Sequence, residues 1–170
     1  MNSNNTLIHV IRFFLLVLVQ VLVLNNIEFS GFINPYLYIL FIILLPFDAE
    51  PWLVMILGFV LGISVDMFSN TMGMHATACV LMAFLRPSVI RLMIPKNDFD
   101  AFPNPSMFEL GMSRFVSYAL FLTLIHHFTL FYVEVFHFKY FFSTFFRAIF
   151  STVFTLLLII FVQYLFFKKK

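Results

Sequence analysis

The segment PWLVMILGFVLGISVDMF, residues 51–68, carries one charged side chain, Asp66. A helix of this length rises about 27 Å, close to the roughly 30 Å hydrocarbon thickness of a bilayer. Pro51 suits the first turn of such a helix. The whole chain is similar in character, since 62% of its residues are hydrophobic, 11% are charged, and its mean hydropathy is +1.02. A soluble domain of 170 residues cannot bury this much apolar surface, so the sequence predicts an integral membrane protein.

Comparable apolar runs lie on both sides of this segment. They cover residues 7–24, 32–47, 73–94, 114–133 and 140–167. We therefore predict an all-α fold, in which residues 1–170 form a single integral membrane domain, a polytopic bundle of about six transmembrane helices. Pro87 predicts a kink or an early end near Arg86. The second run is short for a span, so a re-entrant hairpin made from it and residues 51–68 is the alternative to a full crossing.

The distribution of basic residues predicts the orientation. Arg86, Arg91, Lys96 and Arg114 flank the loop between the fourth and fifth runs, and three lysines end the chain at residues 168–170. Because basic residues in short loops mark the cytoplasmic side, we expect both termini in the cytoplasm. The first run has neither a basic segment before it nor a small-residue cleavage site after it, so we expect it to remain attached.

The motifs of common membrane and soluble enzymes are missing from the sequence. It contains no His-Glu-x-x-His motif, no Gly-x-Ser-x-Gly motif and no glycine-rich phosphate loop, and Asp66 has no second intramembrane aspartate as a partner. The one cysteine, Cys79, excludes an internal disulfide. We expect a protein that is not an enzyme, uses no cofactor or metal, and has the lipid bilayer rather than nucleic acid as its surroundings.

Small residues recur at helical spacing in the third run. Gly58, Gly62 and Asp66 are four residues apart and therefore share one helix face, where glycines allow close approach of another helix. Gly73 opens the fourth run. These glycines predict either tight packing inside the bundle or a docking face for the single span of a partner.

Polar residues inside the apolar runs form a second group of candidates. With six spans, Asp66, His75, His127 and Arg147 all fall in the outer half of the membrane. Because a charge inside lipid needs a partner or a role, we expect a polar intramembrane cluster, with an Asp66–Arg147 pair as one possibility. We interpret the doublet of His127 with its neighbour as hydrogen-bonded packing rather than a metal site.

The predicted cytoplasmic segment, residues 96–113, is polar but contains aromatic side chains. Phe99, Phe102 and Phe108 lie there among acidic residues. Two interpretations are open for this loop: it binds a cytoplasmic partner, or its aromatic side chains lie at the lipid interface.

The stretch GISVDMFSNTMGMHA, residues 62–76, resembles the central region of the rod shape-determining protein MreD family. The length, the six spans and the long loop after the fourth span also look like that family. The resemblance implies a non-enzymatic scaffold of the bacterial cell-elongation complex, which directs cell shape and peptidoglycan synthesis from the cytoplasmic (inner) membrane. It implies packing against the transmembrane helix of MreC, and association with the MreB filament, RodA and a class B penicillin-binding protein.

That family is similar in fold to the substrate-binding subunits of energy-coupling-factor transporters. A vitamin or small-molecule transporter subunit is therefore the alternative function, and a polar cluster in the outer half would suit its ligand pocket. The first run, residues 7–24, lacks the Ala-x-x-x-Ala spacing with which those subunits dock their energising partner. This difference favours the scaffold.

Overall fold

The computed structural model describes residues 3–27, 32–94, 105–136 and 140–166. Over these ranges the chain is helical, without strands, which confirms the all-α prediction. Five helices are long and apolar enough to cross a membrane, and the protein is a membrane protein by this criterion. They are α1 (Ser3–Leu22), α3 (Pro51–Ser69), α4 (Met74–Met93), α7 (Met112–Val135) and α8 (Phe141–Phe166).

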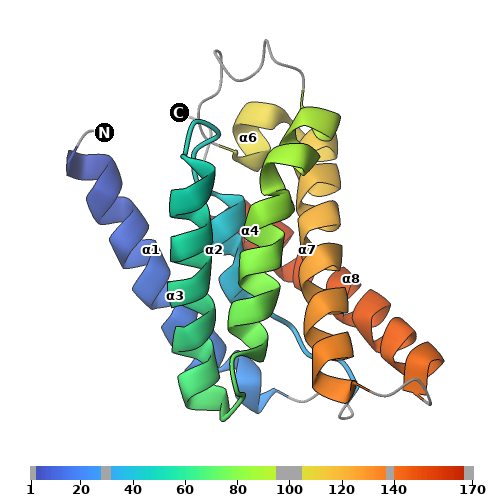
Figure 1. Ribbon diagram of the computed structural model, residues 1–170. Helices are drawn as coiled ribbons and strands as arrows, with labels where there is room; N and C mark the ends of the chain where they lie inside the picture. The colour runs from blue at the N-terminus through green and yellow to red at the C-terminus, as the bar shows by residue number, and fades with distance from the viewer. Residues whose placement is uncertain (1–2, 28–31, 95–104, 137–139, 167–170) are drawn as a thin grey trace.

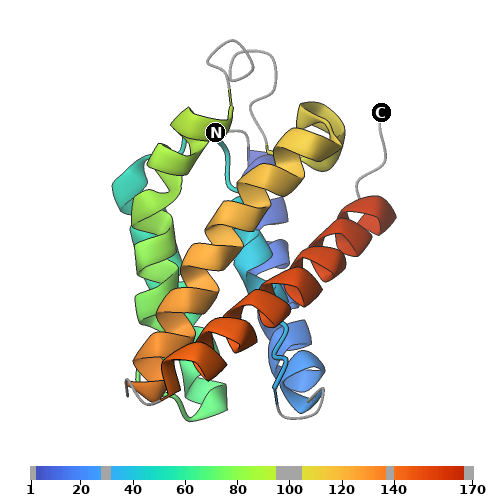
Figure 2. The same ribbon diagram turned by 90° about the vertical axis from the view of Figure 1, so that its right-hand side faces the viewer.

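The five long helices run alternately up and down, with one exception. α1 and α3 run in the same direction, and Asn25 Nδ2, just after α1, donates a hydrogen bond to Ser69 Oγ at the end of α3 (3.0 Å; Figure 1). α4 and α7 follow in opposite directions, and α8 returns at a marked tilt (Figure 2). We call the end that contains the α3–α4 turn, residues 70–73, the turn end, and the other the N-terminal end.

Because α1 and α3 both begin at the N-terminal end, the chain must return through the bundle between them. Residues 32–47 make this crossing with only a short 3₁₀ turn, Leu37–Ile39, and one α-helical turn, α2 (Leu40–Ile43). The prediction of a transmembrane helix over residues 32–47 is therefore wrong, and the described bundle has five spanning helices rather than six. The re-entrant hairpin is also wrong, since α3 runs the full length beside α4 (Figure 1).

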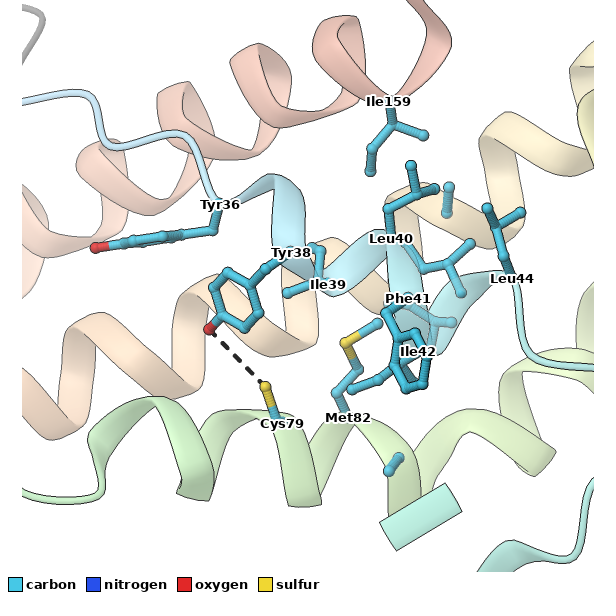
Figure 3. Close-up of a cluster of buried hydrophobic side chains, with 14 of the residues drawn as sticks. Tyr36, Tyr38, Ile39, Leu40, Phe41, Ile42, Leu44, Cys79, Met82 and Ile159 are labelled. Carbon is cyan, nitrogen blue, oxygen red and sulfur yellow. Dashed lines mark hydrogen bonds between the residues drawn. The ribbon is translucent and has the colours of Figure 1, made fainter. Parts of the chain in front are cut away.

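This central segment, residues 32–47, is shielded from lipid by the long helices. Tyr38, Ile39, Ile42 and Ile43 have no exposed surface, and Leu40 has 1%. Figure 3 shows the segment between Ile159 of α8 and Met82 of α4. Irregular backbone is tolerated at membrane depth only where protein surrounds it and satisfies its polar groups. The burial of this segment explains how a crossing without a long helix is possible.

The remaining elements begin and end close to the predicted residues. α4 continues through Pro87 to Met93, so the expected early end is not found. The short helix α6 (Met107–Leu110) precedes α7, and Ser106 Oγ caps it by accepting a hydrogen bond from the Glu109 N–H (3.2 Å). Large apolar side chains such as Phe14 and Leu157 remain more than half exposed on the outside, where lipid would cover them.

Candidate functional site

Asp66 holds the α3–α4 turn together. Its Oδ2 accepts a hydrogen bond from the Ala76 N–H (2.9 Å), and its Oδ1 accepts from the His75 N–H (3.1 Å) and the Thr71 hydroxyl. The first N–H groups of a helix have no partner inside the helix, and a carboxylate there also favours the positive end of the helix dipole. Gly73 adopts φ +77°, and a Cβ added there would meet nothing within 4 Å. Gly73 therefore serves the turn conformation rather than helix packing.

The glycine face of α3 packs against α4. A Cβ at Gly62 would lie 2.4 Å from Ala76 Cα, and a Cβ at Gly58 would lie 3.1 Å from the Cys79 carbonyl oxygen. Backbone-to-backbone approach of this kind needs residues without side chains. The interpretation of this face as a docking surface for a partner's span is thus wrong, because α4 already occupies it.

Two histidines meet on one tyrosine in the interior. The Tyr38 hydroxyl lies 2.8 Å from His75 Nδ1 and 2.7 Å from His126 Nε2. The neighbouring His127 donates from Nδ1 to the Thr123 carbonyl (2.9 Å) and faces the Thr155 hydroxyl through Nε2 (3.2 Å). The sequence predicted a packing role for His126 and His127 and a place in the polar cluster for His75 and His127. It did not indicate Tyr38, because nothing in the pattern showed which residues of the second run face these histidines.

Arg147 pairs with a different carboxylate from the one expected. Its Nη1 lies 3.1 Å from Glu134 Oε1, and its guanidinium carbon lies 4.3 Å from the centre of the Phe131 ring. With the Asn34 amide turned so that its donor and acceptor find partners, Asn34 Oδ1 accepts from Arg147 Nη2 at 2.7 Å. The predicted Asp66–Arg147 pair is not formed between these two described residues, because Asp66 is engaged by the α4 backbone.

Polar side chains of α1 and α8 satisfy the backbone of the central segment at this level. Ser151 Oγ accepts from the Asn34 N–H and Thr155 Oγ1 accepts from the Tyr36 N–H, both at 3.1 Å. From the other side, Gln20 Nε2 donates to the Pro35 carbonyl (3.0 Å). These side chains of α8 and α1 therefore replace the hydrogen bonds that a regular helix would have made itself.

Arg86 performs the same task toward the N-terminal end. It is only 2% exposed, donates from Nε to the Tyr118 hydroxyl (2.9 Å), and donates from Nη2 to the carbonyls of Leu45 and Pro46. Tyr118 in turn donates to the Ile43 carbonyl (3.1 Å). Arg86 was expected beside the loop after the fourth run, but it lies within α4. There its buried guanidinium holds the end of the central segment by hydrogen bonds, and we call it the clamp of that segment.

A cavity of about 360 Å³ opens at the turn end of the bundle. Its polar lining includes Asn25, Asn34, Tyr36, His75, Glu134 and Arg147, supplied by the end of α1, the central segment, α4, α7 and α8. Of the predicted polar cluster, His75 and Arg147 line the cavity, while Asp66 and His127 lie outside its lining. The structure thus brings two of the four together at a surface that a small molecule can reach.

Only one of the three phenylalanines in the segment predicted to be cytoplasmic lies within the described residues. Phe99 and Phe102 lie outside the described residues. The Phe108 ring packs 6.3 Å from the Tyr164 ring of α8, so it contributes to the bundle rather than extending from it. Beside it, partial burial raises the pKa of the Glu109 carboxyl above its usual value.

The described residues contain no group of three or more histidine, cysteine or acidic side chains placed to hold a metal. Comparisons with protein families, with curated proteins and with solved structures find no match for the chain.

Proposed function

We propose that the protein is a non-enzymatic scaffold of the MreD type, located in the bacterial cytoplasmic membrane with both termini in the cytoplasm. The observation that carries this proposal is the structure of residues 62–76, the stretch on which the resemblance rests. Gly62 allows α4 to approach α3, Asp66 caps α4, and Gly73 takes a left-handed conformation. The three residues on which the pattern rests, Gly62, Asp66 and Gly73, thus each have a structural task, which supports the proposal.

The buried polar groups support a role without catalysis. In the interior, Thr155 and His127 resemble a nucleophile with its base, at 3.2 Å. Both side chains have no exposed surface, and Thr155 Oγ1 also accepts the Tyr36 N–H. A substrate could not reach this hydroxyl without dismantling the packing around the central segment.

A scaffold of this type needs an outward-facing surface for its single-span partner. Because α4 covers Gly58 and Gly62, the contact must be made by another helix face. A photo-crosslinking amino acid placed singly at Phe14, Phe59, Phe121 and Leu157 samples α1, α3, α7 and α8, each at an exposed position. Crosslinks to the partner from one helix and not from the others would identify the interface.

The deciding experiment is copurification of the tagged protein from its native membrane in mild detergent. We expect a single-span MreC-like protein, an MreB filament protein, RodA and a class B penicillin-binding protein. A version lacking residues 98–103, which keeps the Ser106 cap of α6, should still insert but should recover less filament protein. Recovery of none of these partners from the full chain would contradict the scaffold.

The transporter subunit remains the second candidate because of the cavity at the turn end. Its volume of about 360 Å³ lies near the lower limit of small-molecule sites, about 300–1,000 Å³. In the copurification, recovery of an ATPase pair with a membrane coupling subunit would favour this function over the scaffold.

A further inference from the structure

We infer that the turn-end cavity binds a small uncharged group that carries hydroxyl or amide functions, such as a polyol or a sugar unit. This inference goes beyond the scaffold role and does not depend on it. It rests on three features of the cavity: its two charged side chains pair with each other, one buried donor on its wall has no partner among the described residues, and further polar side chains line it. Each feature selects against a class of ligand.

The charges of the lining neutralise each other. Arg147 bonds to Glu134 at 3.1 Å, and Asn34 and the Phe131 ring hold its guanidinium from two further directions. Arg147 Nε has no hydrogen-bond partner among the described residues, but it is buried away from the cavity surface. An anionic ligand would have to displace Glu134 from Arg147, and a cationic ligand would have to displace Arg147 from Glu134. An uncharged ligand requires neither, so the lining favours neutral molecules.

The hydrogen-bond network inside the bundle fixes what His75 presents to the cavity. Tyr38 has one hydroxyl hydrogen to share between His75 Nδ1 and His126 Nε2. His126 Nδ1 is buried without a partner, and a buried N–H is more costly to leave unpaired than a bare acceptor. His126 therefore donates from Nε2, Tyr38 donates to His75 Nδ1, and His75 carries its hydrogen on Nε2.

His75 Nε2–H is thus an unpaired donor on the cavity wall. The side chain is 96% buried, since its exposed fraction is 4%, and Nδ1 is occupied by Tyr38. Nε2 forms no hydrogen bond with the described residues and is not sealed from the cavity. A buried donor without a protein partner points to an acceptor supplied by a ligand.

The rest of the lining favours a ligand that also donates hydrogen bonds. The second carboxylate oxygen of Glu134 accepts no hydrogen bond from the described residues, while the first holds Arg147. The Tyr36 hydroxyl has the Asn34 side chain as a hydrogen-bond partner, and Figure 3 shows it extending away from Tyr38 and Cys79. Hydroxyls and primary amides combine donor and acceptor in one small group, whereas ethers and esters only accept.

The same chemistry has two possible sources, because the cavity lies at one end of a membrane bundle. One is a soluble polyol or sugar, and the other is the sugar headgroup of a glycolipid. The experiment uses the full protein in phosphatidylcholine nanodiscs, free of sugar detergents. Saturation-transfer NMR is recorded with glucose and myo-inositol, and with the charged analogues glucosamine and glucose 6-phosphate. A second arm adds monoglucosyl diacylglycerol to the nanodisc and detects the bound lipid by native mass spectrometry.

We expect transfer from the neutral probes or retention of the glycolipid, with the responding arm identifying the source, and weaker signals from both charged analogues. Val21→Trp should abolish the signal because Val21 lines the cavity, whereas the matched Val23→Trp lies outside it and should not. Met74→Trp and the fully exposed Met72→Trp form a second pair, in case Val21→Trp does not fold.

Three outcomes would overturn the inference: no binding in either arm, stronger binding of a charged analogue, or unchanged binding in both cavity-filling variants. None of these would bear on the scaffold, which the copurification tests separately.

Discussion

The α3–α4 hairpin and the central segment solve the same problem in opposite ways. In the hairpin, each helix satisfies its own backbone, and small residues let the two helices approach until Gly62 touches Ala76. In residues 32–47 the backbone is largely irregular, and its polar groups bond to side chains of α1, α4, α7 and α8. Lipid offers no hydrogen bonds, so a crossing must be either self-sufficient or fully supplied by its neighbours.

This difference matters for function because the central segment links the whole bundle. Its residues connect Gln20 near the turn end to Arg86 toward the N-terminal end, and Tyr36 and Asn34 from the same segment line the cavity. The central segment therefore contacts both the cavity and the far end of the bundle. The hairpin, by contrast, is a rigid wall that positions His75.

The largest effect is expected at the clamp of the central segment. Arg86→Met would leave the Leu45 and Pro46 carbonyls and the Tyr118 hydroxyl with lost partners. Since each buried polar group left unpaired costs about 1–3 kcal/mol, we expect the free energy of unfolding to fall by at least about 3 kcal/mol. Denaturant titration in mixed micelles measures this change.

Arg91→Met is the matched control, because Arg91 lies on the exposed side of the same helix with a single 3.4 Å contact to Ser88. We expect its effect to stay within about 0.5 kcal/mol. Equal stability of the Arg86 and Arg91 variants would contradict the claim that neighbouring side chains stabilise the central segment through its backbone hydrogen bonds.

Next in size is a change in the hairpin. Gly62→Ala would place a Cβ 2.4 Å from Ala76 Cα. The nearest atoms all belong to the backbone of α4, so the clash is relieved only if the two helices move apart. Overpacking of this kind costs about 1–3 kcal/mol, and we expect a value near the upper end. Gly58→Ala meets its nearest atom at 3.1 Å and should cost clearly less. Thermal unfolding of the two variants side by side measures the difference, and the reverse order would place the close approach elsewhere on α3.

A smaller effect is expected where α8 supports the central segment. Thr155→Val removes the acceptor of the Tyr36 N–H and the partner of His127 Nε2 while keeping the side-chain shape. We expect a loss of about 1–3 kcal/mol, the cost of a buried unpaired group. In Thr129→Val the lost hydroxyl bonds only to the Ile125 carbonyl of its own helix, so this variant should be nearly neutral. A Thr129 variant as unstable as the Thr155 variant would show that the loss of any hydroxyl, rather than support of the segment, is being measured.

The two regions also explain what the sequence could predict. The long helices follow from apolar runs, and the close packing of α3 follows from the spacing of Gly58 and Gly62. Residues 32–47 were predicted to form a short transmembrane helix. An apolar composition indicates that a segment is buried, but it does not determine whether its backbone is helical. The spacing of Ser151 and Thr155 places both on one face of α8, but their partners, the Asn34 and Tyr36 N–H groups, depend on tertiary contacts. Arg86 was expected beside a loop, because the sequence does not distinguish an arginine at a helix end from one buried against the central segment.

The smallest effect is expected at the rim of the cavity. Water reaches this pair, so its polar groups depend neither on their own helix nor on neighbouring side chains. Glu134 and Arg147 retain exposed fractions of 38% and 19% in their side chains, so water can replace either partner. Glu134→Gln keeps an oxygen that accepts from Arg147 but removes the charge, and exposed ion pairs contribute less than about 1 kcal/mol. We expect a change below that value which shrinks further as salt is raised, measured by unfolding at two ionic strengths. A loss as large as that of Thr155→Val, and independent of salt, would mean that the rim supports the bundle as the interior does, and that Glu134 is not free to take part in binding.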